Sequence, residues 1–449
     1  MKTHVIILAA GLGKRMHTNY PKVMQMLGGM TMIERVLHAA QKITDKITVI
    51  SGFKAETLEA HINKEFSNII FCRQDEQLGT AHAVKMASEH IHNKEKVLIL
   101  YGDVPLIKKD TLDAVIDSEE VCLLTATLGN PTGYGRIVED GSGCVQKIVE
   151  EKDANDQEKS IKTIFTGVMM VEGALLLDGL NKIRNDNASN EYYLTDLVSV
   201  LHNKGAKINY IIADPSEVQG ANNKNELHEL EQVYRNMKSK ELLDMGITVV
   251  DTDRVDLRGS IVAGKDCYID VNVILEGSIH LGEGVKILSN CYLKDVSIEN
   301  NTTIESFSHI VSTKIASNCS VGPYARLREG TILNEGAKIG NFVETKKTTI
   351  GRASKANHLA YLGDAEVGEE SNIGAGTITC NYDGTNKHQT IIGSRSFIGT
   401  NSSLVAPLNV GSNVYIGAGS VITKDVEDNA LAVSRAKQLT KPGYSKKKK

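Results

Sequence analysis

Residues 269–293 of this chain read IDVNVILEGSIHLGEGVKILSNCYL. Aliphatic residues recur in this stretch at every sixth position, at Ile269, Leu275, Leu281, Ile287 and Leu293. A period of six is typical of a parallel β-helix, in which each hexad forms one short strand and its aliphatic side chain fills the interior. Gly, Asn, Asp and Ser are frequent between these positions, and they suit the corners between strands. The stretch therefore predicts a triangular prism with about eighteen residues per coil.

The same period extends far along the C-terminal half, through Val321, Leu327, Leu333 and Ile339 and again through Ile398, Leu404, Val410, Ile416 and Ile422. Chance alternation in a β-sandwich would give a period of two. Roughly ten coils, about 4.8 Å apart, would make a prism about 50 Å long. The register breaks in residues 375–391, AGTITCNYDGTNKHQTI, which we expect to project as a loop.

The N-terminal half has a different pattern, in which strand-like and helix-like runs alternate. Val5–Leu8, Ile47–Ile50 and Val97–Leu100 predict strands, and Met32–Ala40 predicts an amphipathic helix. This alternation favours an α/β fold with a largely parallel sheet.

The two patterns meet in a charged segment whose apolar residues recur at helical spacing and which ends at Gly246. We therefore expect a first domain of residues 1–224, a linking helix of residues 225–245 and a second domain of residues 246–449. The final Lys446–Lys449 run predicts a disordered tail.

The composition fits a soluble globular protein, with 41% hydrophobic and 24% charged residues in a chain of 449. A net charge of −4 gives no reason to expect nucleic acid or an anionic membrane as a partner. The seven cysteines are scattered without a C-x-x-C pair, which favours a reducing, cytoplasmic location over disulfides or a zinc site. The apolar run Val5–Ala10 is too short for a membrane span or a signal peptide.

A glycine-containing loop follows the first predicted strand, with Gly11 and Gly13 next to Lys14 and Arg15. Such a loop lets backbone amides approach phosphate. Met16 stands where a dinucleotide fingerprint needs a third glycine, and the Gly-Lys-Ser/Thr of a P-loop is absent. Taken alone, this loop is equally typical of a plain strand–helix turn.

Two later segments strengthen the interpretation of this half as a nucleotide site. Gln74 and Gln77 carry side-chain amides that can read a base edge. Asp103 follows a predicted strand, where open α/β sheets bind ligands, and a carboxylate with substrate phosphates is the usual way to hold Mg²⁺.

The β-helix half carries a second group of chemically active residues. Arg and Lys side chains on adjacent coils can hold a sugar phosphate. Among them stands His358, and histidine is the side chain best suited to accept a proton near neutral pH. A lone histidine is more often a surface residue, but the basic and polar neighbours favour a catalytic role.

The order of the N-terminal segments resembles that of the sugar-nucleotide pyrophosphorylases. The whole chain, essentially all 449 residues, resembles the bacterial bifunctional N-acetylglucosamine-1-phosphate uridyltransferases/glucosamine-1-phosphate acetyltransferases. The resemblance implies a Rossmann-like α/β nucleotidyltransferase domain, a linking helix and a left-handed parallel β-helix of hexapeptide repeats. It also implies a cytoplasmic homotrimer that uses Mg²⁺. The implied reactions are acetyl transfer from acetyl-CoA to glucosamine-1-phosphate and then uridylyl transfer from UTP to N-acetylglucosamine-1-phosphate.

The resemblance also assigns residues to the first site. The UTP phosphates would be held by Leu8, Ala9, Ala10, Gly11, Gly13, Arg15 and Lys22. Uracil and nearby groups would be held by Gln74, Gln77, Gly79 and Thr80, and Tyr101 and Gly102 would also bind substrate. Asp103 and Asn222 would coordinate Mg²⁺, and Gly135 and Glu150 would contact the sugar. One position departs from the family pattern, because Phe165 stands where an Asn is expected before Thr166-Gly167.

For the second site the resemblance assigns His358 as the general base. Glucosamine-1-phosphate would be bound by Arg328, Lys346, Tyr361, Asn372 and Lys387. Acetyl-CoA would be bound by Ala375, Asn381, Tyr382, Thr400, Ala418 and Arg435.

Two alternative hypotheses differ in what the β-helix does. In one, the chain is a nucleotidyltransferase for another sugar phosphate and the β-helix serves only assembly or regulation. In the other, the whole chain is a non-catalytic scaffold. His358 with its basic neighbours argues against the first alternative, and the phosphate loop with Asp103 argues against the second.

Overall fold

The structure is a computed structural model that describes residues 1–141 and 143–444. The predicted Lys446–Lys449 tail lies outside these residues. The chain packs as two compact units whose boundary falls between Tyr234 and Arg235. We call them the N-terminal and the C-terminal unit.

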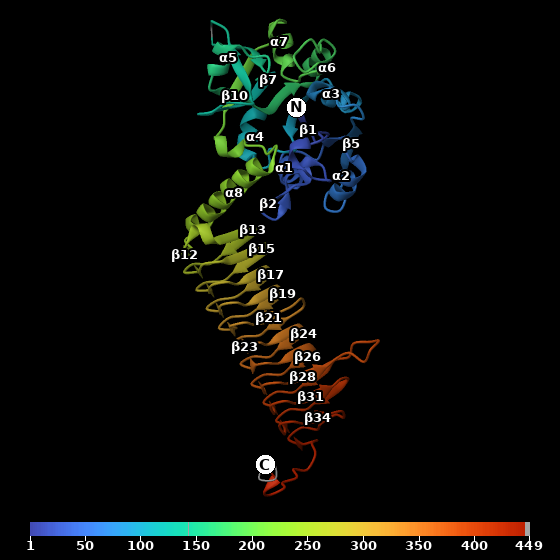
Figure 1. The fold of residues 1–449 in the computed structure, drawn as a ribbon, viewed down its shortest axis with the longest axis vertical. Coiled ribbons are helices and arrows are strands. Elements are labelled where there is room, and N and C mark those ends of the chain that lie inside the picture. The colour runs from blue at the N-terminus through green and yellow to red at the C-terminus, as the bar shows by residue number, and fades with distance from the viewer. Residues whose placement is uncertain (142, 445–449) are drawn as a thin grey trace. The chain divides into compact units, whose positions relative to one another are not determined.

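The N-terminal unit is built on a nine-stranded mixed sheet (Figure 1). Seven strands follow the order β11-β7-β10-β6-β1-β4-β5, and the hairpin β8–β9 joins at β10. The strands are β1 (Lys2–Leu8), β4 (Ile47–Ser51), β5 (Ile69–Arg73), β6 (Glu95–Tyr101), β7 (Val121–Thr127), β8 (Gly135–Glu139), β9 (Val145–Val149), β10 (Thr163–Glu172) and β11 (Ile208–Ile212), with a separate short pair β2 (Met26–Leu27) and β3 (Met30–Thr31). The three predicted strands are confirmed as β1, β4 and β6, but β10 runs antiparallel between β6 and β7.

Helices cover both faces of this sheet and enclose two apolar cores. One face is covered by α1 (Met32–Gln41), α2 (Ala55–Ile62) and α4 (Lys109–Ile116), and the other by α3 (Thr80–Lys85), α6 (Gly173–Leu180) and α7 (Asp196–His202). The short α5 (Asp156–Ser160) follows β9. The predicted helix α1 begins at a capping box, in which Thr31 and Glu34 each accept a hydrogen bond from the other's backbone amide.

The register of β1 and β6 brings the two nucleotide motifs to the same edge of the sheet. Leu8 pairs with Tyr101, and the Gly102 amide donates to the Leu8 carbonyl over 2.9 Å. The glycine loop and Asp103 therefore leave neighbouring parallel strands at their carboxyl ends, the place where such sheets bind ligands.

A long helix, α8 (Lys224–Asp244), occupies the position for which a linking helix is expected. The boundary between the two units falls inside it. Gly246 follows with a φ of 80°, which suits the residue that ends a helix. None of the described helices is both long and apolar enough to cross a membrane.

The C-terminal unit is a parallel β-helix whose short strands stack into two long ladders (Figure 1). The 11-stranded ladder contains β12 (Thr248–Val249), β14 (Tyr268–Ile269), β16 (Lys286–Ile287), β18 (Thr303–Ile304), β20 (Ser320–Val321), β23 (Lys338–Asn341), β25 (Lys355–His358), β27 (Asn372–Ile373), β30 (Phe397–Ile398), β33 (Tyr415–Ile416) and β35 (Leu431–Ala432). The 13-stranded ladder contains β13 (Val255–Ala263), β15 (Val273–Leu281), β17 (Tyr292–Ile298), β19 (His309–Ile315), β21 (Arg326–Leu327), β22 (Ile332–Leu333), β24 (Glu344–Ile350), β26 (Tyr361–Val367), β28 (Ile378–Cys380), β29 (Thr390–Ile392), β31 (Ser403–Val405), β32 (Leu408–Val410) and β34 (Val421–Ile422).

The six-residue period is explained by the interior of this helix. Ile269, Ile287 and Ile304 pair in successive coils, and each is fully buried. Full burial of one such side chain stabilises the fold by about 1.5–3 kcal/mol relative to exposure. The coil length predicted from the period is confirmed, since these partners lie 18 and 17 residues apart.

The register break is confirmed, but the projecting loop is shorter than predicted. Ile373 pairs with Ile398, so one coil contains extra residues. Within the predicted loop, β28 and β29 continue the ladder, which leaves residues 381–389 to project (Figure 1). A bridge between Tyr382 and Lys387 closes this segment into a small hairpin.

The corners of the coils contain more than the small residues that the sequence predicts. Phe307, Tyr324, Phe342 and Leu359 all adopt the left-handed conformation, with φ between 49° and 62°, and all are exposed. Bulky residues seldom adopt this conformation. The Phe307 and Tyr324 rings stack at 4.8 Å and the Tyr324 and Phe342 rings at 5.3 Å, so contacts between coils accompany the unusual backbone. We call these four residues the apolar ridge.

Candidate active sites

A cavity of about 550 Å³ opens at the carboxyl ends of β1 and β6. It brings together twelve of the residues predicted for the nucleotide site, Leu8, Ala9, Ala10, Gly11, Lys22, Gln74, Gln77, Gly79, Thr80, Tyr101, Asp103 and Asn222. These residues come from four separate parts of the sequence. Lys14, whose positive charge stands beside the glycine loop in the sequence, also lines the cavity, as do Leu12 and Glu191, which the sequence does not single out.

A second, smaller cavity of about 190 Å³ shares a wall with the first. It contains the predicted sugar residues Gly135 and Glu150, and Tyr101, Asp103 and Asn222 line both cavities. A nucleotide in one cavity and a sugar phosphate in the other would therefore meet beside Asp103. This arrangement suits transfer of a nucleotidyl group between two bound substrates.

The shared wall is a polar cluster around the Lys22 ammonium group. Lys22 Nζ donates to Asp103 Oδ2 and, over 3.0 Å, to Asn222 Oδ1. Glu226 orients the amide, because its Oε2 accepts hydrogen bonds from Asn222 Nδ2 at 3.0 Å and from the Asn222 backbone amide at 2.8 Å. The Asn222 oxygen therefore faces Lys22. Glu226 lies in the first turn of α8, where sequence reasoning did not identify it.

The oxygen atoms of this cluster suit Mg²⁺ better than they suit a metal whose ligands all come from the protein. Within residues 1–141 and 143–444, no three His, Cys, Asp or Glu side chains gather as a metal site. Asp103 and Asn222 instead offer one carboxylate and one amide oxygen that converge on a cation, Lys22. Mg²⁺ characteristically takes one or two protein oxygens and completes its shell with water and substrate phosphates.

The glycine before α3 is required by a close backbone contact. Gly79 has a φ of 117°, and a Cβ at this position would lie 2.5 Å from the Tyr192 carbonyl oxygen. The Ala81 amide donates to that same carbonyl, and the Tyr192 amide donates to the Leu78 carbonyl. The segment around Tyr192 thus holds the N-terminus of α3 against the nucleotide cavity. Gln77 reaches the phosphate loop, since its Nε2 donates to the Ala10 carbonyl over 2.8 Å.

The smaller cavity, which contains the residues predicted to contact the sugar, has acidic lining residues, Asp103 and Glu150. Glu150 Oε1 accepts a hydrogen bond from Thr195 Oγ1 over 3.0 Å, and burial raises the pKa of Glu150. Burial, together with repulsion from Glu150 and Asp153, raises the pKa of Asp196 to about 6. Phe165 lines the same cavity and packs into an apolar core, with 5% of its surface exposed.

Three of the residues predicted for the first site do not line either cavity, namely Gly13, Arg15 and Gly102. Gly13 precedes a short 3-10 helix, Lys14–Met16, on which Arg15 is exposed. Gly102 is packed beneath the cavity against Ile33 and Val23. Their neighbours Lys14 and Asp103 face the cavity instead.

In the C-terminal unit, five predicted residues form a row along the prism. His358 and Ala375 are neighbours because the Gly376 amide donates to the Leu359 carbonyl over 3.1 Å. Hydrogen bonds from Asn401 to Ala375 and from Gly419 to Thr400 carry the row onward to Ala418. Arg435 Nη1 ends the row on the Ala418 carbonyl, at 2.6 Å. An elongated thioester cofactor could lie along such a row.

His358 is exposed and is oriented by the preceding coil. Its Nδ1 lies 2.7 Å from Asn341 Oδ1, and Asn341 pairs with His358 in the ladder. An amide oxygen only accepts hydrogen bonds, so Nδ1 carries the proton and Nε2 keeps a free lone pair. This is the tautomer that a general base requires, and sequence reasoning did not identify Asn341.

Two basic residues of this site belong to the other side of the coil, Lys346 within β24 and Arg328 directly after β21. Arg328 Nη1 pairs with Glu344 Oε1 and Lys346 Nζ with Glu329 Oε1, each at 2.9 Å. Tyr361 pairs with Glu344 in the next coil. A Cβ on Gly363 would lie 2.5 Å from the Tyr361 hydroxyl and 2.8 Å from Asn381 Nδ2, so glycine leaves room for both groups.

The remaining predicted residues lie apart from this cluster. Asn372 belongs to the 11-stranded ladder, where it pairs with Lys355 and Phe397. Tyr382 and Lys387 are exposed on the projecting hairpin. In that hairpin Asp383 Oδ2 lies 2.7 Å from His388 Nε2, and backbone amides, with His388, lower the pKa of Asp383 to about 2.

The folds and sites together define a class, a nucleotidyltransferase domain joined to a hexapeptide-repeat transferase. Residues 5–137 match the MobA-like NTP transferase domain, and residues 389–424 match the bacterial transferase hexapeptide family of six repeats. These matches agree with the predicted fold class, a Rossmann-like α/β domain followed by a left-handed parallel β-helix.

Similarity to curated proteins extends over the whole chain. The bifunctional protein GlmU of Pseudoalteromonas atlantica is 46% identical, over 99% of each chain. GlmU of an Azoarcus species is 45% identical over 98% of each chain, and GlmU of Acinetobacter baumannii strain AYE is 46% identical over 100% of this chain and 99% of its own. The chain belongs to the GlmU family of bifunctional enzymes. It is therefore an enzyme with uridyltransferase and acetyltransferase activities, and neither alternative hypothesis is favoured.

Proposed function

We propose that the two activities are divided between the two sites. Acetyl transfer to glucosamine-1-phosphate takes place at His358, and uridylyl transfer to N-acetylglucosamine-1-phosphate takes place between the two cavities beside Asp103. The product is UDP-N-acetylglucosamine, a precursor of cell-envelope polymers. The observation that carries the proposal is the convergence of residues from distant parts of the chain on Lys22, Asp103 and Asn222.

In the uridylyl step, an oxygen of the sugar phosphate attacks the α-phosphorus of UTP, and the bond to pyrophosphate breaks. Charge develops on the phosphate oxygens, and Lys14, Lys22 and the amides of the glycine loop lie where they can stabilise it. Glu150, fixed by Thr195, accepts hydrogen bonds from sugar hydroxyl or amide groups. The remaining catalysis is positioning of the two substrates.

Asp103 and Asn222 would hold Mg²⁺ in this site, with Glu226 keeping the amide oxygen of Asn222 turned inward. When bound, the metal neutralises phosphate charge and aligns the two substrates. Lys22 touches both oxygens and would turn toward the phosphates when they bind.

In the acetyl step, the amine of glucosamine-1-phosphate attacks the thioester carbonyl of acetyl-CoA, and coenzyme A leaves as the thiol. His358 Nε2 accepts the proton of the attacking amine, and Asn341 stabilises the protonated imidazole through Nδ1. Arg328, Lys346 and Tyr361 hold the sugar phosphate, and Lys387 approaches from the hairpin. Acetyl-CoA lies along Ala375, Thr400, Ala418 and Arg435, with Asn381 and Tyr382 at its reactive end.

The acetyl site is completed in a homotrimer. His358 is exposed, and Asn372 lies on a different ladder from Lys346 and Tyr361, so a neighbouring copy can supply missing contacts. The exposed apolar ridge ends at Leu359, next to His358, and provides an apolar face for that neighbour. Sedimentation of a stable monomer with full acetyltransferase activity would contradict this assembly.

Residues 1–224 carry uridylyl transfer, residues 225–245 form the link, and residues 246–449 carry acetyl transfer. The protein works in the cytoplasm. Support for a reducing compartment comes from the seven cysteines, all of which are free thiols.

One incubation tests the proposed sequence of reactions. The protein is mixed with glucosamine-1-phosphate, acetyl-CoA, UTP and Mg²⁺, and the products are identified by mass. UDP-N-acetylglucosamine, coenzyme A and pyrophosphate should accumulate together. Omission of acetyl-CoA should stop all of them, whereas omission of UTP should leave N-acetylglucosamine-1-phosphate. Direct formation of UDP-glucosamine without acetyl-CoA would contradict the order.

A further inference from the structure

The side-chain amide of Gln74 in the nucleotide cavity is held in one orientation. Gln74 follows β5, lines the cavity and is 4% exposed. Its Nε2 donates to the Gly79 carbonyl over 3.0 Å. A carbonyl oxygen only accepts hydrogen bonds, so this contact alone decides which end of the amide carries the hydrogens.

The second hydrogen of this amide is directed at His82. Gln74 Nε2 lies 3.0 Å from His82 Nδ1. Since Nε2 of Gln74 is a donor, His82 Nδ1 must accept, which places the proton of the neutral imidazole on Nε2. With both hydrogens engaged, Oε1 is the polar group of Gln74 that remains for a ligand.

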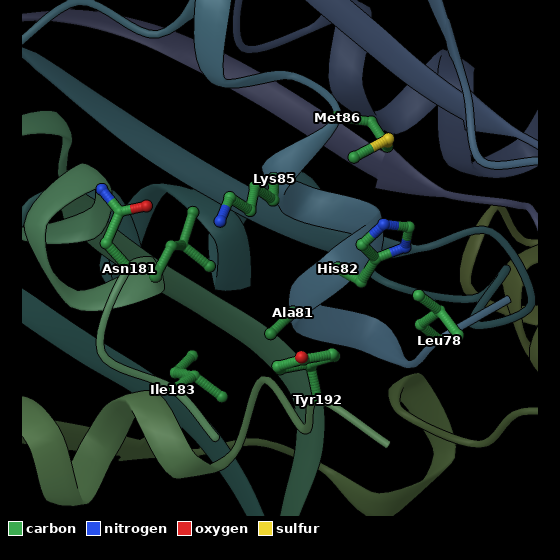
Figure 2. Close-up of a pocket in the computed structure, with 9 residues that line it drawn as sticks. Leu78, Ala81, His82, Lys85, Met86, Asn181, Ile183 and Tyr192 are labelled. Atoms are coloured by element: carbon green, nitrogen blue, oxygen red, sulfur yellow. The ribbon is translucent and has the colours of Figure 1, made fainter. Parts of the chain in front are cut away.

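His82 approaches Gln74 from α3. The helix is held at its start by the Ala81–Tyr192 hydrogen bond. His82 also lines a separate cavity of about 410 Å³ with Leu78, Lys85 and Tyr192 (Figure 2). It does not line the nucleotide cavity, so any effect on UTP must pass through another residue.

An accepting oxygen at this place distinguishes between the two pyrimidine bases. Uracil carries a hydrogen on N3, which Gln74 Oε1 can accept. Cytosine has a lone pair at N3 and would oppose one acceptor with another. A buried polar group left unpaired in this way costs far more than a hydrogen bond contributes, which is the usual source of strong discrimination.

We infer that His82 is a positioning residue that sets the preference for UTP over CTP, an inference that rests on the proposed uridylyl site. It accepts the second hydrogen of the Gln74 amide and thereby keeps Oε1 turned toward the base. Without that acceptor the amide gains freedom to rotate and to present its NH₂ group.

The test compares two variants of nearly equal shape in the full-length protein. Asn in place of His82 retains an acceptor near the position of Nδ1, whereas Leu does not. UTP and CTP are compared as substrates with N-acetylglucosamine-1-phosphate and Mg²⁺, and the melting temperature of the N-terminal unit reports whether that unit, which contains His82, is folded. His82→Leu should raise KM for UTP about two- to tenfold and lower the UTP/CTP ratio of kcat/KM by at least that factor, with a smaller change in kcat. His82→Asn should keep most of the wild-type ratio.

A double variant separates positioning from packing. In a Gln74→Leu background, His82→Leu should leave the UTP/CTP ratio unchanged, because the amide that it orients is gone. Equal ratios in wild type and His82→Leu would overturn the inference, and so would equal losses in the Leu and Asn variants. If His82→Leu does not fold, His82→Asn and the additional variant His82→Gln, which both carry an acceptor, replace it. Retention of the wild-type UTP/CTP ratio of kcat/KM in these variants supports the role of the acceptor, and its loss in both overturns the inference. Absence of uridylyl transfer in the wild type would instead refute the proposed function.

Discussion

The two sites of this protein differ in how they are enclosed. The proposed uridylyl site lies in cavities within one unit, where Lys22, Asp103 and Gln74 are largely buried and hydrogen-bonded to partners in the same chain. The proposed acetyl site lies on the outside of the prism, where His358, Lys387 and Thr400 are exposed. An open α/β sheet forms a crevice at its strand ends, whereas a β-helix fills its own interior and offers only outer faces.

Because of this difference, the two sites have different requirements. A site within a crevice can be complete in one chain, because loops from several strand ends surround the ligand. A site on the face of a prism can exclude water only when something else covers it. The uridylyl site should therefore respond to substitutions within its own unit, and the acetyl site should respond also to assembly.

The largest expected effect is at the exposed site. His358→Ala should lower acetyl transfer about 10²- to 10⁴-fold, because the variant has no base to accept the amine proton. Uridylyl transfer from supplied N-acetylglucosamine-1-phosphate should not change. His280→Ala, which removes an exposed histidine of β15 elsewhere on the prism, serves as the matched control. Near-wild-type acetyl transfer in His358→Ala would show that another group is the base.

The reciprocal experiment is at the enclosed site. Asp103→Asn keeps the shape of the side chain and removes its charge, and it should lower uridylyl transfer about 10²- to 10³-fold. Acetyl transfer should remain at the wild-type rate. Asp110→Asn, an exposed position at the start of α4, is the control. Loss of both activities in a folded Asp103→Asn protein would refute the assignment of one reaction to each unit.

Acid should destabilise the N-terminal unit through a buried histidine, His4. His4 Nδ1 lies 3.1 Å from Glu95 Oε1, and burial, reinforced by Lys46, lowers the pKa of His4 from 6.5 to about 4. The unfolded chain then binds the proton more tightly between pH 6.5 and pH 4, so stability decreases as the pH falls through this window. The loss should reach about 3 kcal/mol at pH 4.

Thermal inactivation followed separately for the two activities measures this effect. Uridylyl transfer should become heat-sensitive between pH 7 and pH 4.5 before acetyl transfer does. His4→Gln removes the titrating group and should reduce the pH dependence, although it also lowers stability at pH 7. An equal pH dependence in wild type and His4→Gln would exclude His4 as the cause.

Truncation tests whether the enclosed site is complete in one unit. Residues 1–234 retain Glu226, which orients Asn222, and Tyr234, whose ring lies 4.1 Å from the Arg35 guanidinium carbon. Residues 1–225 lack both contacts. Both fragments should catalyse uridylyl transfer, but the shorter one about tenfold less efficiently at limiting Mg²⁺, because a charge-assisted hydrogen bond is lost. Equal activity would mean that Glu226 does not orient Asn222.

The smallest expected effect concerns Phe165. An Asn at this position restores an amide that can meet the sugar, and KM for N-acetylglucosamine-1-phosphate should fall about two- to tenfold. The same change exposes an apolar core and should lower the melting temperature of the N-terminal unit. Phe165→Leu, which keeps an apolar side chain without an amide, should not lower KM. An unchanged KM in Phe165→Asn would show that the missing amide is not needed.

The sequence by itself determined the features that repeat or that are local. The period of six predicted the β-helix because every coil places equivalent residues in the same interior position, so the signal recurs many times. The predicted strands over 5–8, 47–50 and 97–100 lie within β1, β4 and β6, since an apolar run of strand length suffices for a buried strand. The glycine loop and Asp103 were likewise predicted because each follows such a strand directly.

Only the tertiary structure decided the contacts between residues far apart in the chain. Lys22, Asp103 and Asn222 come from three different elements and converge only in the folded unit. Lys22 begins a short 3-10 helix, Asp103 follows β6 and Asn222 precedes α8. The antiparallel direction of β10 and the bulky residues at left-handed corners also cannot be predicted from the local sequence, because neighbouring strands and coils stabilise them. Glu226, Asn341 and His82 contact other functional side chains rather than the expected ligands, and hydrogen bonds of this kind depend on a geometry that one-dimensional spacing does not contain.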